Sequence, residues 1–251
     1  MNKKAEPTDL RDGWLKLARE LEEHLQQLRD EGVTEVEADP EQVRRIALPP
    51  VFPPPAAEES ADVAAGLAAV AEKVRACTRC PLHATRTRTV PGQGSTAPEI
   101  MFIGEGPGAD EDQQGLAFVG RAGQLLTKII EAMGFTREQV FIGNIVKCRP
   151  PGNRVPMPEE MQTCLPYLRE QIALLKPKVI VALGATAVKG LLDTQSGITR
   201  LRGQWMSYEG IDLMPTFHPA YLLRNPAGKK DVWEDMKAVL ARLGREPPPR
   251  K

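Results

Sequence analysis

The chain has 251 residues, of which 41% are hydrophobic and 26% charged, with 33 basic residues against 33 acidic ones. These values are ordinary for a globular protein and allow one good-sized domain with an appendage. No apolar run approaches the length of a membrane span, and no apolar segment follows the first lysines, so we expect neither a membrane protein nor a secretory signal. We therefore expect a cytosolic protein, in which four cysteines serve as metal ligands or free thiols rather than disulfides.

The charge is unevenly placed along the chain. Residues 1–60 carry 8 Lys and Arg against 14 Asp and Glu, a net charge of −6, and the remainder carries +6. A basic body is compatible with a polyanionic partner, although most charged stretches are solvated surface.

The first 60 residues predict an appendage in two parts. Residues 1–33 hold apolar side chains at steps of three and four residues, including Trp14, Leu17 and Leu21, which predicts an amphipathic helix. Such a helix packs on the body or on a second copy, or docks a protein partner. Residues 34–60 are acidic and then proline-rich, which predicts an extended linker.

The main domain is expected over residues 61–245, followed by a loose proline-rich tail over 246–251. Apolar segments predict four buried strands at 100–103, 140–146, 178–184 and 212–217. Helical patterns are expected at 61–76, 122–133, 158–175, 185–192 and 230–243. This alternation predicts an α/β fold, a three-layer α/β/α sandwich with a short, four-stranded and mostly parallel sheet.

The polar, irregular segments all follow predicted strands, so they gather at one rim of the sheet, where open α/β proteins bind ligands. One of them, Gly106-Pro107-Gly108, forms a tight turn that brings bare backbone to this rim. It matches neither the G-x-G-x-x-G pattern nor a P-loop, which argues against a dinucleotide or a nucleoside triphosphate.

The four cysteines form one C-x2-C pair, Cys77 and Cys80, and two distant single residues, Cys148 and Cys164. Both zinc sites and iron–sulfur clusters use such sets. His83 is an alternative zinc ligand. The spacing of the last two cysteines, on a loop and in a helix, favours a cluster over zinc, with unligated core cysteines as a third interpretation.

Three further residues mark the rim as a binding site. Asn144 ends an apolar strand, where an amide offers a donor and an acceptor side by side, or else caps a nearby loop. Phe118 lies in a glycine-bounded loop, from which it could stack on a planar ligand. His218 stands where a strand ends in a proline turn, which favours a functional over a purely structural histidine.

These residues together resemble the family 4 uracil-DNA glycosylases. The resemblance covers about residues 64 to 243 and rests on Gly104-Glu105-Gly106-Pro107-Gly108 with Glu111-Asp112, Phe118-Val119-Gly120, Asn144, the four cysteines and His218-Pro219-Ala220. It implies the uracil-DNA glycosylase fold, a [4Fe–4S] cluster, and hydrolysis of the N-glycosidic bond of a flipped-out uracil, which leaves an abasic site and starts base excision repair. It also implies work in the prokaryotic cytosol or nucleoid.

The resemblance also assigns roles to residues of this chain. Cys77, Cys80, Cys148 and Cys164 would hold the cluster. The backbone of Gly106, Pro107 and Gly108 would lie against the uracil, Phe118 would stack on it, and Asn144 would read its O4 and N3–H edge. His218 would stabilise the negative charge that develops at O2.

The family 1 relatives have an aspartate at the position of Gly106 and a tyrosine at that of Gly108. Without that aspartate, Glu105 and Glu111 are the nearby carboxylates that could orient the attacking water. Without that tyrosine, thymine exclusion lacks its usual wall.

The expected partners are uracil-containing DNA, single- or double-stranded, and the downstream enzymes that process abasic sites; the protein itself is expected to be a monomer. Leu222 or a neighbour, with Arg224, would enter the gap in the duplex. Basic residues on the loops would hold phosphates. These are Lys147, Arg149, Arg154, Arg200, Arg202 and Arg224.

Two alternatives are a family X-type protein that traps uracil-DNA covalently and a non-catalytic iron–sulfur or zinc module that only binds DNA. The first goes with an extra histidine before the last strand, and residues 198–204 contain none. The second is disfavoured by the complete set of site residues.

Overall fold

The computed structural model describes residues 57–192 and 194–248, together with the single residue Gln26. Apart from Gln26, the predicted N-terminal helix within 1–33 lies outside these residues, as do nearly all of the predicted linker and the end of the predicted tail. No helix in the described part of the chain is long and apolar enough to cross a membrane.

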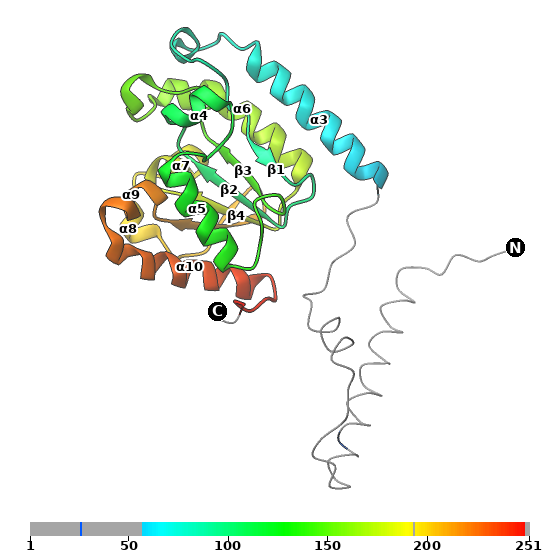
Figure 1. The fold of residues 1–251 in the computed structure, drawn as a ribbon, viewed down its shortest axis with the longest axis vertical. Coiled ribbons are helices and arrows are strands. Elements are labelled where there is room, and N and C mark those ends of the chain that lie inside the picture. Colours follow the sequence, from blue (N-terminus) through cyan, green and yellow to red (C-terminus); the bar gives the residue numbers. More distant parts are fainter. Residues whose placement is uncertain (1–25, 27–56, 193, 249–251) are drawn as a thin grey trace, which may run out of the picture. The chain divides into compact units, whose positions relative to one another are not determined.

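The described residues form one six-stranded sheet in the order β1-β3-β2-β4-β6-β5 (Figure 1). The four inner strands are parallel to one another and match the four predicted ones. They are β2 (Ile100–Gly104), β3 (Phe141–Asn144), β4 (Val179–Leu183) and β6 (Ile211–Thr216). The α/β class is therefore confirmed, with a mostly parallel sheet.

The predicted number of four strands is wrong, because two short edge strands pair antiparallel at the margins of the sheet. These are β1 (Gln93–Gly94) and β5 (Met206–Tyr208). Two or three residues are too few to show the alternation that identifies a strand in a sequence.

Helices lie on both faces of the sheet, and the alternating side chains of β2 show how. Ile100 and Phe102 belong to the apolar cluster that includes residues of α5 and α10, whereas Met101 and Ile103 belong to the cluster with residues of α6 and α7. The helices are α3 (Ala57–Arg75), α4 (Ala109–Gln114), α5 (Arg121–Ala132), α6 (Pro158–Leu175), α7 (Ala185–Leu192), α8 (Ile198–Leu201), α9 (Pro219–Arg224) and α10 (Lys229–Arg242). Short 3-10 turns cover Pro81–Ala84, Pro151–Asn153 and Pro226–Gly228.

One predicted boundary needs correction, and three short helices were not predicted. Helix α3 begins at Ala57, so the helical part of the main domain starts before residue 61. Helices α4, α8 and α9 lie in segments that were expected to be irregular. Each has four to six residues, which is too short for a helical repeat of apolar side chains to appear.

The register of the sheet brings the polar segments to one rim, as the sequence predicts. Gly104 at the end of β2 is the partner of Asn144 at the end of β3. Leu183 at the end of β4 is likewise the partner of Thr216 at the end of β6. The loops that follow these strands therefore meet above the carboxyl ends of the four parallel strands.

Candidate active site

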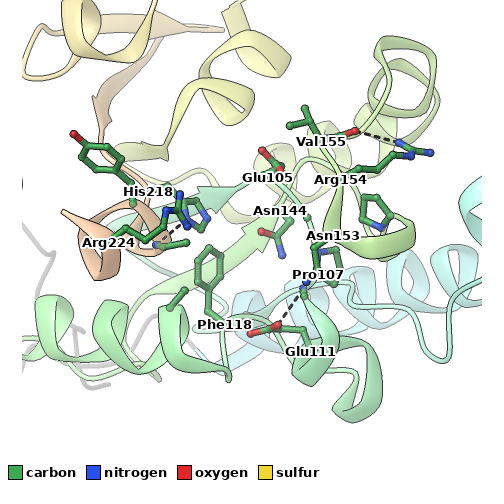
Figure 2. Close-up of a pocket in the computed structure, with 16 residues that line it drawn as sticks. Glu105, Pro107, Glu111, Phe118, Asn144, Asn153, Arg154, Val155, His218 and Arg224 are labelled. Atoms are coloured by element: carbon green, nitrogen blue, oxygen red, sulfur yellow. Dashed lines mark hydrogen bonds between the residues drawn. The ribbon is translucent and has the colours of Figure 1, made fainter. Parts of the chain in front are cut away.

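A pocket of about 530 Å³ opens at this rim (Figure 2). All eight residues that were predicted to hold or to act on the base line it. They are Glu105, Gly106, Pro107, Gly108, Glu111, Phe118, Asn144 and His218. They come from the segment between β2 and α5, which includes α4, from the end of β3 and from the loop after β6, so the structure unites residues that are more than a hundred positions apart in the sequence.

Asn144 is 1% exposed, and its Oδ1 is the one buried side-chain polar atom in the described residues that has no hydrogen-bond partner. A buried acceptor without a donor costs about 1–3 kcal/mol, so such atoms are rare in folded proteins. Gly104 makes room for the amide, since a Cβ there would lie 2.6 Å from Oδ1. The arrangement leaves an amide edge at the floor of the pocket for a ligand N–H group.

His218 precedes helix α9, and its Nδ1 accepts a hydrogen bond of 3.1 Å from the backbone N–H of Ala220. Because Nδ1 is the acceptor, the neutral ring carries its proton on Nε2. Burial, with the nearby positive charge of Arg224, lowers the pKa of His218 from 6.5 to about 4. The ring is therefore neutral at pH 7 and has an N–H to donate to a ligand in the pocket.

Phe118 forms a wall beside these two groups, with its ring 5.6 Å from that of His218, centroid to centroid. Its backbone has φ of +53°, a conformation that a bulky residue rarely adopts. Two glycines leave room for it: a Cβ at Gly104 would lie 2.5 Å from Cζ of the ring, and a Cβ at Gly123 would lie 1.9 Å from the Phe118 carbonyl oxygen. Close packing thus fixes an apolar ring against the pocket.

The Glu111 carboxylate accepts hydrogen bonds from backbone N–H groups around the pocket. One carboxylate oxygen accepts the N–H of Gly108 at 3.0 Å, and the other accepts the N–H groups of Val119 and Gly120 at 2.9 and 2.8 Å. These bonds join the turn after β2 to the loop that carries Phe118. The second acid of the motif, Asp112, is also structural, since it is 2% exposed and accepts the backbone N–H of Thr87 at 2.9 Å.

Glu105 differs from Glu111 because its carboxylate makes one hydrogen bond, from the hydroxyl of Thr186 at 2.5 Å. Thr186 is 9% exposed and lies in the first turn of α7, beyond the end of β4. No motif in the sequence marks Thr186, although its place after a predicted strand puts it in one of the rim segments. The bond leaves Glu105 with unused acceptor capacity on the pocket side (Figure 2).

Among the basic residues that were predicted to contact DNA, Arg154 and Arg224 line the pocket. The Arg154 guanidinium makes two hydrogen bonds to Glu160, at 2.7 and 2.8 Å, so it also fixes the loop after β3. Arg149 donates through Nε to Asn153 of the same loop at 2.8 Å. Arg200 is exposed on α8. Their contacts with phosphate stay predictions.

Of the other predicted DNA contacts, the structure rules out Lys147, and it places Leu222 and Arg202 against partners within the protein. Leu222 is 1% exposed and packs in the core, whereas its neighbour Leu223 is 39% exposed. Arg202 donates to buried Asp235 and to the Asp231 carbonyl, because these partners from α10 lie beside it. Lys147 is buried and donates to Gln171 at 2.7 Å, so its ammonium group cannot reach a phosphate.

The four cysteines line a second, small cavity between the 75–86 segment and helix α6. No three His, Cys, Asp or Glu side chains of the described residues are close enough to hold a single metal ion. Two N–H groups point at sulfur atoms: Arg86 Nη1 lies 3.2 Å from Cys148 Sγ, and the backbone N of Lys147 lies 3.3 Å from Cys164 Sγ.

Burial raises the pKa of the Cys148 thiol, and it raises that of Cys164 to about 11. Thiolates at these positions therefore need a positive partner, which a bound metal centre supplies. Four thiols around one cavity, with N–H donors and the cations of Arg86 and Lys147 at its edge, fit a sulfur-ligated centre.

Comparison with known proteins agrees with this geometry. A profile of the Uracil DNA glycosylase superfamily matches residues 91–237. The type-4 uracil-DNA glycosylase of Thermotoga maritima is 47% identical over 183 residues, which cover 70% of this chain and 94% of that protein. The type-4 enzymes of Sulfurisphaera tokodaii and Pyrobaculum aerophilum are 46% and 43% identical, covering 68% and 66% of this chain and 81% and 88% of theirs.

Proposed function

The chain belongs to the type-4 uracil-DNA glycosylases of the uracil DNA glycosylase superfamily, and we propose on that premise that it removes uracil from DNA as the first step of base excision repair. The predicted family is thereby confirmed. The enzyme is a hydrolase: water adds to C1′ of the deoxyribose, the bond from C1′ to N1 breaks, and uracil leaves with the bonding electron pair. An abasic site remains in the strand.

The single observation that carries this proposal is the unpartnered Oδ1 of Asn144. Uracil has an N3–H donor next to its O4 acceptor, and one amide satisfies both, with Oδ1 accepting from N3–H and Nδ2 donating to O4. Cytosine has an acceptor at N3 and an amino group at C4, so it presents the opposite pattern to the same amide. The floor of the pocket is thus suited to uracil.

His218 acts on the other side of the base. As the bond to C1′ breaks, negative charge develops at uracil O2, where the Nε2–H of the neutral imidazole donates a hydrogen bond. Phe118 stacks on the face of the base in the same pocket. Phe118 thus fixes the plane of the base, Asn144 binds its polar edge, and His218 stabilises the charge at O2.

We assign the orientation of the water to Glu105 rather than Glu111. Glu111 already accepts three backbone N–H groups, whereas Glu105 accepts one hydroxyl and lines the pocket. In this role the Glu105 carboxylate accepts a hydrogen bond from the water that adds to C1′, which helps the oxygen to reach the positively charged sugar.

We further propose that Cys77, Cys80, Cys148 and Cys164 hold a [4Fe–4S] cluster, supported by their place around one cavity and the N–H donors at two of the sulfurs. The four cysteine thiolates would hold the irons of the cluster, which would thereby join separate segments of the chain. Since the reaction is a hydrolysis, no electron transfer is required of it.

The experiment incubates purified full-length protein with an oligonucleotide that contains one uracil, and with a thymine control, followed by alkali, which breaks the strand at abasic sites. A visible spectrum with iron and sulfide analysis is recorded on the same preparation. We expect uracil-dependent strand breaks from a brown protein that contains four irons per chain.

Intact strands from a brown, folded protein would refute the proposal of turnover. An adduct with uracil-DNA that survives SDS would then identify a covalent trap. DNA binding that His218→Ala leaves unchanged would identify a non-catalytic module. If turnover is found, the abasic product requires enzymes that process such sites, and these are the proposed downstream partners.

A further inference from the structure

The loop between β3 and α6 presents two apolar side chains to solvent. Val155 is 61% exposed and Met157 53%, which are the largest values among the large hydrophobic residues that the structure describes. Exposed single hydrophobic residues are common on surfaces, but these two stand two positions apart on one loop that borders the pocket.

Contacts within the loop keep these two side chains exposed. Arg154 forms a two-bond ion pair with Glu160, which is 3% exposed, and the backbone N–H of Met157 donates to the same carboxylate at 2.7 Å. Arg149 is bonded to Asn153, as described above. The loop also contains prolines, each with a restricted φ, at positions 150, 151 and 156. A loop held in this way has little freedom to turn Val155 and Met157 inward.

Val155 belongs to the rim of the pocket. It lines the cavity together with Asn144 and His218, and in Figure 2 it lies on the side away from His218 and Arg224. A base that enters the pocket therefore passes between the Val155 loop and helix α9, which carries the half-exposed Tyr221 and Leu223.

Flipping a base has a consequence for its neighbours on the same strand, because each loses a stacking partner. The uncovered base faces are apolar, and proteins that unstack DNA cover such faces with apolar side chains. Positive charge for the flanking phosphates lies in the same loop, on Arg149.

We propose, on the basis of the function above, that Val155 and Met157 cover the base next to the flipped uracil on the uracil-containing strand. The occupant of this surface is then a nucleobase of that strand, since Val155 lines the cavity that receives the uracil. Val155 and Met157 would touch the neighbouring base and not the glycosidic bond. They therefore act as positioning residues for the bound strand.

The test compares full-length wild-type protein with the double variant Val155→Thr, Met157→Gln, which keeps side-chain size and removes apolar surface. The probe is a fluorescent oligonucleotide whose single uracil carries a 2′-fluorodeoxyribose, which slows cleavage so that equilibrium binding can be measured. It is used as a single strand and as a duplex, with Kd measured by anisotropy and the cleavage rate measured on ordinary deoxyuridine under single turnover.

We expect the double variant to raise Kd about tenfold on both probes, which corresponds to roughly 50 Å² of apolar surface left uncovered. The single-turnover rate at saturating enzyme should change much less, because the groups at the glycosidic bond are intact. A second double variant, Val155→Ile, Met157→Leu, keeps both side chains apolar and should bind with an affinity close to that of the wild type. Thermal melting of each variant checks that the loop still folds.

An unchanged Kd on both probes would overturn the inference, and so would a change confined to the duplex, which would assign the contact to the opposite strand. These outcomes are distinct from failure of the proposed function, because wild-type protein that does not release uracil fails the cleavage assay before any variant is compared.

Discussion

The backbone N–H of Ala220 donates to Nδ1 of His218 at 3.1 Å, and this bond ties the proposed catalytic imidazole to the first turn of helix α9. His218 is the N-cap of α9, a position where Ser, Thr, Asp or Asn usually accepts the free N–H. Here the imidazole accepts it, which leaves the proton on Nε2. The tautomer that the proposed role of His218 requires is thus set by the formation of the helix.

The first prediction concerns pH. Burial, with Arg224 nearby, lowers the pKa of His218 to about 4, so the neutral donor persists well below pH 6.5. The single-turnover rate of uracil release should lose no activity through His218 between pH 8 and 5, and should fall as the pH approaches 4. A protonated imidazole that catalyses would instead give activity that rises as the pH drops through 6.5. Rates at saturating enzyme, over stepwise buffers of constant ionic strength, distinguish the two.

The same shift fixes the sign of a stability effect. The folded-state pKa lies below the unfolded value of 6.5, so the unfolded chain takes up a proton first as the pH falls from about 6.5 towards 4. The folded protein should lose stability over that interval relative to His218→Asn, and denaturant titrations of both proteins at pH 7 and pH 5 measure it. An equal loss in the variant would contradict the assignment.

The substitution Asn144→Ala should lower the activity strongly and change the stability little. Its Oδ1 has no partner among the described residues, so Asn144→Ala removes no hydrogen bond of that atom in the free protein. We expect kcat/KM to fall by roughly 100-fold or more, because the polar edge of uracil is left unpaired. The free energy of unfolding should change by only about 1 kcal/mol, since lost packing is offset by removal of an unpaired acceptor. A large stability loss without an activity loss would sink this assignment.

Substitution of the two glutamates should have different effects: Glu105→Gln should mainly lower the rate, and Glu111→Gln should mainly lower the stability. Glu105→Gln keeps the bond to Thr186 possible and should lower the single-turnover rate about 10- to 100-fold with little change in melting temperature. Glu111→Gln turns an amide N–H toward backbone N–H donors and should cost about 1–3 kcal/mol of stability, with a raised KM. Melting curves and single-turnover kinetics on both variants decide which carboxylate has which role.

The inner strands and the rim could be predicted because the signals are local. Strands β2, β3, β4 and β6 are each runs of four to six residues, mostly apolar, and a parallel α/β arrangement then brings Gly106, Asn144 and His218 to one edge. The roles of these residues came from the family resemblance, which the comparisons confirm at the level of the family.

Some side chains that were predicted to face DNA have partners within the protein that the sequence does not reveal. Lys147 and Arg202 are charged and therefore predicted at the surface, but their partners Gln171 and Asp235 lie 24 and 33 positions further along the chain. No short pattern announces such a pairing. In α9, six residues are too few to reveal which of Leu222 and Leu223 faces inward.

Phe118 gives a prediction about packing at the pocket wall. Gly123 lies in α5, where alanine ordinarily stabilises a helix by about 0.5–1 kcal/mol. A Cβ at Gly123 would lie 1.9 Å from the Phe118 carbonyl oxygen, so Gly123→Ala should reverse that sign, shift the ring and lower both stability and activity. Gly197→Ala, at the N-cap of α8, is the control for a Cβ that has space around it, because a Cβ there meets no atom within 4 Å. Equal melting temperatures and rates for the two variants would contradict the role given to Gly123.

The last prediction concerns the cysteines and their link to the pocket. Cys148 and Cys164 lie at either side of the loop that carries Arg154 and Val155, so a cluster held by both would clamp that loop. Cys164→Ser should remove the brown colour, lower the melting temperature and expose residues 150–157 to limited proteolysis. Thr163→Ser, beside the same cavity, should keep the colour and the protection. Chelation of iron from the wild-type protein should reproduce the loop cleavage, since the clamp and not the serine is responsible. A colourless Cys164→Ser protein with an intact, protease-resistant loop would show that the Arg154–Glu160 ion pair and the prolines hold the loop without the cluster.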